Sequence, residues 1–173
     1  FYINDGENIW SPGWKPCKTE LDKYICRHGL NYTVITGAKN GLEVEILYMV
    51  PLHTWAEVQK VTLKNTTNQI KRFKVFSFVE WCLWNAQSDM ENFQRNLSLG
   101  EVEVENSILF HKTEYRERRN HYSYYSVNVP INGFETDRES FLGMYNGFDQ
   151  PQAVTQGRAC NSIAHGWSPI ASH

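Results

Sequence analysis

The fold is decided by residues 31–50, which read NYTVITGAKNGLEVEILYMV. Two segments, 31–36 and 42–50, flank a turn at 37–41 that contains the dipeptide Asn40-Gly41. An Asn-Gly pair between two alternating segments is a strong signal for a β-hairpin. In the second arm, apolar and polar residues alternate from Glu43 to Ile46, as they do in a strand with one buried face. The stretch therefore predicts an antiparallel sheet that covers a core on one side.

The same two-residue period recurs along the rest of the chain. It predicts strands at 57–64, 72–81, 99–105, 108–115 and 121–129. Segment 72–81 has aromatic residues on both faces, which favours a central strand that is buried on both sides. Thr136 and Glu139 form a capping-box pattern, which predicts one short helix that stops near Gly143 or Gly147.

Short strands joined by turn residues, with one short helix, indicate a mainly β protein. We expect an antiparallel β-sandwich, with residues 1–173 forming part of a single domain. Phe1-Tyr2-Ile3 already reads as a strand, and the chain stops at His173 without a terminating signal. We therefore expect the sandwich to be incomplete at both ends, as in one part of a longer protein.

Composition excludes several classes of protein. The chain has 173 residues, of which 41% are hydrophobic and 21% charged, and this is typical of a folded globular domain. Its net charge of −2 favours neither nucleic acid nor an anionic membrane as a partner. Its longest apolar stretches are far shorter than the roughly 20 residues of a membrane-spanning helix. The four cysteines match no zinc or redox spacing.

Residues with the potential for catalysis do not form a recognisable set. Glu101, Glu103 and Glu105 lie on one face of a predicted strand, where a row of carboxylates is typical of a solvated surface. Glycosidases instead place two carboxyl groups across a glycosidic bond. The six histidines show no metal-ligand spacing, and no nucleophile–base pair is evident. The residues by themselves therefore predict neither a metal site nor a self-contained catalytic site.

Two polar segments are candidates for binding. The first, 84–95, is a long loop between two strands that contains Trp, Asn, Gln, Phe and Arg. Such a loop suits sugar binding, although it could also pack over a sheet edge. The second, 111–122, is rich in arginine, and a two-residue period would put Arg116 and Arg118 on one face. These guanidinium groups could bind carboxylate, phosphate or sugar hydroxyls, or form salt bridges with Glu114 and Glu117.

Several longer motifs resemble the cellobiose phosphorylases of glycoside hydrolase family ninety-four. The similarity extends over essentially the whole chain in order. It rests on WSPGW (10–14), CRHGL (26–30), SFVEWCLWNA (77–86), NFQRN (92–96), GEVE (100–103), HKTEYRERR (111–119) and NSIAHGW (161–167).

The resemblance implies a galactose-mutarotase-like supersandwich at the N-terminus of an enzyme whose (α/α)6 catalytic barrel is absent here. It implies a cytoplasmic homodimer that converts cellobiose and phosphate to α-D-glucose 1-phosphate and D-glucose with inversion. Phosphate is a co-substrate, and no cofactor or metal is expected. The general acid and the phosphate site lie in the barrel, so no catalytic residue is expected in this chain, which alone should be inactive.

The resemblance also assigns roles to the two polar segments. It implies that Arg95, Phe93 and Gln94 contact the acceptor sugar across the dimer. Glu114, Tyr115, Arg116 and Arg118 are expected to form a structural or interface network. Three alternatives remain: a cellodextrin or chitobiose phosphorylase domain, a stand-alone carbohydrate-binding sandwich, and a purely structural or dimerisation module.

Overall fold

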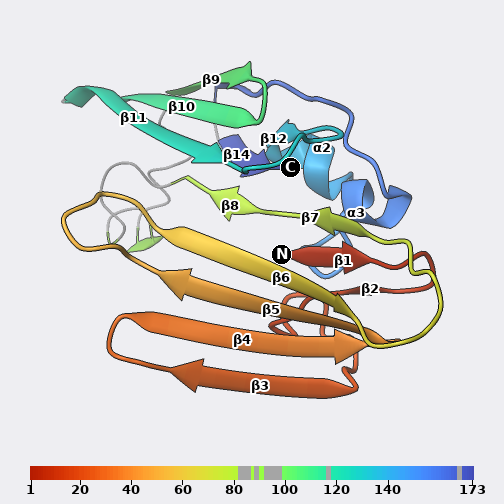
Figure 1. The fold of residues 1–173 in the computed structure, drawn as a ribbon. Coiled ribbons are helices and arrows are strands. Elements are labelled where there is room, and N and C mark those ends of the chain that lie inside the picture. The colour runs from red at the N-terminus through yellow and green to blue at the C-terminus, as the bar shows by residue number, and fades with distance from the viewer. Residues whose placement is uncertain (82–86, 88–89, 92–98, 116–117, 167–168) are drawn as a thin grey trace. The chain divides into compact units, whose positions relative to one another are not determined.

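The computed structural model describes residues 1–81, 87, 90–91, 99–115, 118–166 and 169–173, with the backbone alone at 99, 113–115, 118–121 and 165. These residues form antiparallel strands and two short helices (Figure 1). The chain divides into two compact units, Phe1–Val75 and Phe76–His173. The predicted mainly β, antiparallel fold is confirmed.

The first unit is built on a four-stranded antiparallel sheet whose strands follow one another in chain order. These strands are β3 (Lys23–His28), β4 (Tyr32–Lys39), β5 (Leu42–Met49) and β6 (Val58–Asn65). The predicted hairpin is β4–β5, but its turn is shorter than the expected 37–41. The residues Asn40 and Gly41 both have positive φ, 50° and 76°, which is the geometry of a two-residue type I′ turn. Gly37 and Ala38 therefore stay in the strand, opposite Val44 and Glu43.

A smaller sheet contributes the other side of the core in this unit. Its order is β2 (Ile9–Trp10), β1 (Tyr2–Asn4) and β7 (Lys74–Phe76). Ile3 and Trp10 pack with the inward side chains of β5, namely Leu42, Val44 and Ile46. All five are nearly inaccessible to water, so the alternation seen in the sequence corresponds to one buried face of the sheet.

Segment 72–81 is not the single central strand that its pattern predicts. It is divided into β7 and β8 (Val79–Glu80), which belong to different sheets. The interruption lies at Ser77, whose amide donates to the His173 carbonyl and whose Oγ accepts from the His173 amide at 3.0 Å. Because the chain end takes these hydrogen bonds, the strand cannot continue in its first sheet. The aromatic residues on both faces of segment 72–81 thus pack in two different sheets and do not mark one central strand.

The second unit contains two further sheets. The first, in the order β11-β10-β9-β13, consists of β11 (Arg118–Ser126), β10 (Ile108–Tyr115), β9 (Leu99–Glu105) and β13 (His165–Gly166). The second, in the order β12-β14-β8, adds β12 (Glu135–Asp137) and β14 (Pro169–Ser172). The predicted strands 99–105 and 108–115 are confirmed, and a turn at Asn106 joins them. The next strand begins at Arg118 rather than at 121.

Two short helices lie between β12 and β13. The predicted helix is α2 (Arg138–Leu142), and it ends at Gly143 as expected. Its N-cap is Asp137, whose carboxylate accepts from the Ser140 amide, so the expected cap at Thr136 is wrong by one residue. Thr136 is instead fully buried, and its hydroxyl donates to the Ser162 carbonyl. The second helix, α3 (Gln152–Gln156), was not anticipated, although Pro151 before it and Gly157 after it are typical helix boundaries.

Candidate functional site

The last residue of β8, Glu80, and the residue that follows it, Trp81, both make side-chain contacts with other strands or helices. The Glu80 carboxylate accepts a hydrogen bond from Arg138 Nε at 2.8 Å, and the Arg138 guanidinium lies 5.0 Å from the ring centroid of Phe148. The next residue, Trp81, stacks on His111 of β10 with ring centroids 5.2 Å apart and planes within 6°. The chain therefore leaves β8 next to an ion pair and a ring stack, the kind of support that positions binding residues.

The residue that follows segment 82–98 joins the sheet beside β10. The first residue of β9, Leu99, lies opposite Glu114 in the register of the two strands. Glu114 is the penultimate residue of β10, and β10 pairs with β11 through Tyr115 opposite Arg118. The structure therefore brings Leu99, the first residue after segment 82–98, and the paired residues Tyr115 and Arg118 to one end of one sheet. The sequence of neither segment predicts that the two lie close together.

The arginine-rich segment is the end of a hairpin and not one continuous strand. Tyr115 and Arg118 face each other across β10 and β11, with a register irregularity just before them. The expectation that a two-residue period places Arg116 and Arg118 on one strand face stays a prediction, because it depends on the placement of Arg116. Arg116 itself lies outside the described residues, as do the side chains of Glu114, Tyr115 and Arg118, so the proposed network stays a prediction. The predicted acceptor-sugar residues Phe93, Gln94 and Arg95 also lie outside the described part of the chain.

His111, on which Trp81 stacks, is a buried and uncharged histidine. Its exposed fraction is only 2%, and burial lowers the pKa of its imidazole to about 4. Gly100 gives the ring its space, because a Cβ at that position would lie 2.7 Å from His111 Nε2. Both ring nitrogens and the Trp81 Nε1 lack hydrogen-bond partners in the described structure. The ring is thus uncharged at neutral pH and supports the loop base by stacking.

The carboxylates on β9 are solvated, as their pattern predicts. Glu101, Glu103 and Glu105 are exposed, and Glu101 lies 3.8 Å from the Nζ of the half-buried Lys112, a contact in which the carboxylate remains open to water. Exposed pairs of this kind contribute little to stability. The row therefore forms an outer surface and not an acid–base pair.

The burial of one carboxylate, that of Glu135, is not predicted by the sequence. Glu135, at the start of β12, is 1% exposed. Its oxygens accept from the amide of Cys160 and from the amide and hydroxyl of Ser162. These bonds tie segment 160–162 to β12, just before β13 pairs with Gly100 and Glu101 of β9. Its role is structural, and no local sequence signal distinguishes it from an exposed glutamate.

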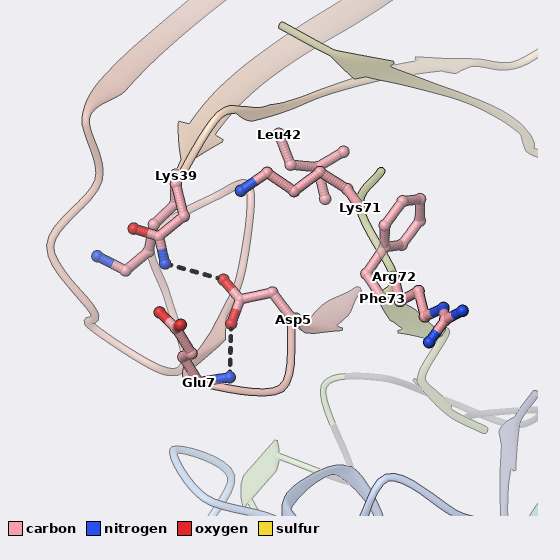
Figure 2. A pocket seen from close by; sticks show the side chains of 8 residues that line it. Asp5, Glu7, Lys39, Leu42, Lys71, Arg72 and Phe73 are labelled. Atoms are coloured by element: carbon pink, nitrogen blue, oxygen red, sulfur yellow. Dashed lines mark hydrogen bonds between the residues drawn. The ribbon is translucent and has the colours of Figure 1, made fainter. Parts of the chain in front are cut away.

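A small hollow lies in the first unit, between β1, the β4–β5 turn and the segment before β7 (Figure 2). Its volume is about 80 Å³, whereas pockets for small molecules usually occupy about 300–1,000 Å³. Asp5, in its wall, already accepts from the Glu7 amide, the Asn8 amide and the Asn40 side chain. The hollow is thus too small for a disaccharide.

Other site types are also missing from the residues that the structure describes. Those residues include no group of three or more His, Cys, Asp or Glu side chains arranged to hold a metal ion. None of their helices is long and apolar enough to cross a membrane.

Comparison with known proteins identifies the family. The model of the glycosyl hydrolase 94 supersandwich domain matches residues 1–173. The chain is 33% identical to solabiose phosphorylase of Paenibacillus borealis, in a match that covers 95% of this chain and 22% of that protein. It is 32% identical to N,N'-diacetylchitobiose phosphorylase of Vibrio proteolyticus, over 92% of this chain and 20% of the relative. A second N,N'-diacetylchitobiose phosphorylase, from Vibrio furnissii, is 31% identical over 93% of this chain and 21% of the relative.

These matches cover nearly all of this chain but only a small part of each relative. The chain spans only about a fifth of the length of the curated relatives it matches. Those relatives act on different disaccharides, so the similarity identifies the domain and not a particular sugar. Because the family model matches residues 1–173, the chain belongs to the glycosyl hydrolase 94 supersandwich domain family.

Proposed function

We propose that this chain is the N-terminal domain of a cytoplasmic, inverting disaccharide phosphorylase that converts cellobiose and phosphate to α-D-glucose 1-phosphate and D-glucose. The family match over the whole chain supports this proposal, together with relatives named as phosphorylases of other disaccharides. Within the described residues, Cys26 and Cys160 form no disulfide, which suits a reducing compartment.

The chemistry of phosphorolysis suits a domain without paired catalytic carboxyl groups. An inverting hydrolase needs both an acid and a base, because water must be activated. Phosphate is already an anion and attacks without a base, so one acid that protonates the leaving oxygen is sufficient. That acid and the phosphate-binding groups would come from a separate catalytic domain. The solvated row on β9 and the structural role of Glu135 agree with this division of labour.

Within that enzyme, segment 84–95, which the sequence predicts to be a loop, would supply contacts to the acceptor sugar in the other subunit of a homodimer. The observation that carries this role is the placement of both loop ends against β10, at Trp81 and at Leu99. A loop held at both ends can present side chains in a defined position. Arg95 would donate hydrogen bonds to sugar hydroxyls, Phe93 would pack beside the sugar ring, and Gln94 would add a further polar contact.

Replacement of the loop arginine tests this role in the complete enzyme. A hydrogen bond from a charged group contributes about 1.5–3 kcal/mol, so Arg95→Ala should weaken glucose binding in the synthetic direction about 10- to 150-fold. The affinity for phosphate and the melting temperature should not change. Arg158→Ala, at an exposed arginine after α3, is the matched control and should leave glucose binding intact.

Mixed dimers test whether the loop acts across the subunit boundary. Subunits with Arg95→Ala are combined with subunits that lack the barrel acid. If the loop serves the partner's site, one site of the heterodimer contains both defects and the other contains neither, so activity returns. A lack of recovery in well-mixed heterodimers would contradict the cross-subunit role.

The choice of sugar is tested by comparing three substrates of the same enzyme: cellobiose, N,N'-diacetylchitobiose and solabiose.

A further inference from the structure

A cysteine, a histidine and a threonine form a hydrogen-bonded chain on the sheet of the first unit. Cys26 and His28 are two residues apart on β3, so their side chains project from the same face. The Sγ of Cys26 lies 3.3 Å from His28 Nε2. The other ring nitrogen, His28 Nδ1, lies 3.0 Å from the Oγ1 of Thr33, and Thr33 is the residue opposite His28 on β4.

This arrangement contains the three parts of an activated nucleophile. A thiol within reach of a base, with the base oriented by a third group, is the pattern by which enzymes and redox proteins activate cysteine. When Nδ1 carries the proton and donates to Thr33 Oγ1, the lone pair of Nε2 points at the thiol. The register of β3 and β4 holds the threonine in place, so the imidazole orientation is set by the sheet itself.

The thiol is also accessible. Both Cys26 and His28 are exposed on the strand, which allows a dissolved reagent to reach the sulfur. The chain provides a contrast in Cys160, which is exposed as well. There, the Glu135 carboxylate raises the pKa of the thiol through a hydrogen bond and its negative charge, and this opposes thiolate formation. The two cysteines therefore have similar access, but Cys26 lies beside an imidazole that can accept a proton, whereas Cys160 lies beside a carboxylate.

We propose that Cys26 is a nucleophilic thiol, activated by His28 and oriented through Thr33, that forms mixed disulfides with low-molecular-weight disulfides. His28 Nε2 takes the proton from the thiol, and the thiolate attacks one sulfur of the disulfide. The new S–S bond forms as the old one breaks, and the departing thiolate takes the proton from the imidazolium. Cys26 is oxidised to the mixed disulfide, and the released half of the reagent is reduced to a thiol. This modification site is independent of the proposed sugar-binding loop.

Site-resolved kinetics with glutathione disulfide test the proposal on the full chain. The rate at each cysteine is followed by the mass of its peptide, so that Cys160 serves as an internal reference. General-base assistance in enclosed sites is worth about 10²–10⁴-fold; for this exposed pair we expect Cys26 to react about tenfold faster than Cys160 at pH 7. Equal rates, or a faster reaction at Cys160, would overturn the proposal without any variant.

Two substitutions then assign the cause. His28→Gln should lower the rate at Cys26 about tenfold, because the base is lost. Thr33→Val keeps the shape of the side chain and removes the hydroxyl, so it should lower the rate by a smaller factor of about three. The Cys160 rate should be the same in all three proteins, because Cys160 lies in the other compact unit. If His28→Gln leaves the rate at Cys26 unchanged, the role of His28 is refuted.

Discussion

The neutral His111 at the base of the loop should make stability depend on pH. Its ring is 2% exposed, and burial lowers its pKa from 6.5 to about 4. The unfolded chain binds a proton below pH 6.5, whereas the folded chain resists doing so until about pH 4. Because the unfolded state then holds more protons, acidification favours unfolding. The stability contributed by the neutral ring is complete above pH 6.5 and is lost as the pH falls toward 4.

The magnitude follows from the two pKa values. Their separation corresponds to about 3 kcal/mol once the pH is below both. Of this, at most about 2 kcal/mol is lost between pH 7 and pH 5. His173, which stacks on Tyr125 with centroids 5.0 Å apart, has its pKa lowered to about 4 by burial as well. The two histidines should therefore contribute similar losses, and removal of one should halve their combined effect.

The assay is the free energy of unfolding from urea titrations at pH 7 and pH 5. His111→Leu fills a similar volume without a titratable group, and we expect it to lose about 2 kcal/mol less between the two pH values than the parent. His53→Asn is the control, because His53 is exposed and asparagine tolerates its positive φ of 60°. The reasoning is refuted if His111→Leu shows the same loss as the parent, or if the His111 C2 proton titrates near pH 6.5 by NMR.

Two further predictions concern single positions in the fold. Gly37→Ala should destabilise the first unit by about 1–3 kcal/mol through overpacking, because a Cβ there would lie 2.6 Å from the carbonyl oxygen of Pro12; an unchanged melting temperature would contradict this close approach. Glu135→Gln puts an NH2 group against the donors of segment 160–162, so it should cost about 1–3 kcal/mol, while the exposed Glu139→Gln should cost little. Hydrogen exchange at 160–162 checks the second prediction, and equal protection in both variants would argue against the role of the carboxylate.

The sheets show where sequence reasoning succeeds. β5 and β9 were predicted because alternation of side chains is a direct consequence of strand geometry. The β4–β5 turn was located because Asn and Gly are the residues that accept positive φ most readily. The boundaries were less accurate: β4 extends through Gly37 and Ala38, since its partner strand continues to pair there. No local pattern reports how far a partner strand extends.

The candidate site was predictable only in part. The composition of segment 84–95 marked it as a binding loop, and the family motifs assigned its residues, but neither indicated that its ends meet β10 next to the arginine-rich hairpin. Cys26, His28 and Thr33 were equally visible in the sequence. Their chemistry became apparent only when β4 brought Thr33 opposite His28.

The sequence by itself determined the strand period, the turn residues, the solvated row of glutamates and the family. Each of these is a property of neighbouring residues or of motifs read in order. Only the tertiary structure decided that segment 72–81 divides at Ser77, that Glu135 is buried and bonded, and that His111 is neutral. The physical reason is that these features depend on groups far away along the chain, such as His173 for Ser77 and Ser162 for Glu135. Hydrogen-bond partners and burial at such separations are set by the packing of sheets.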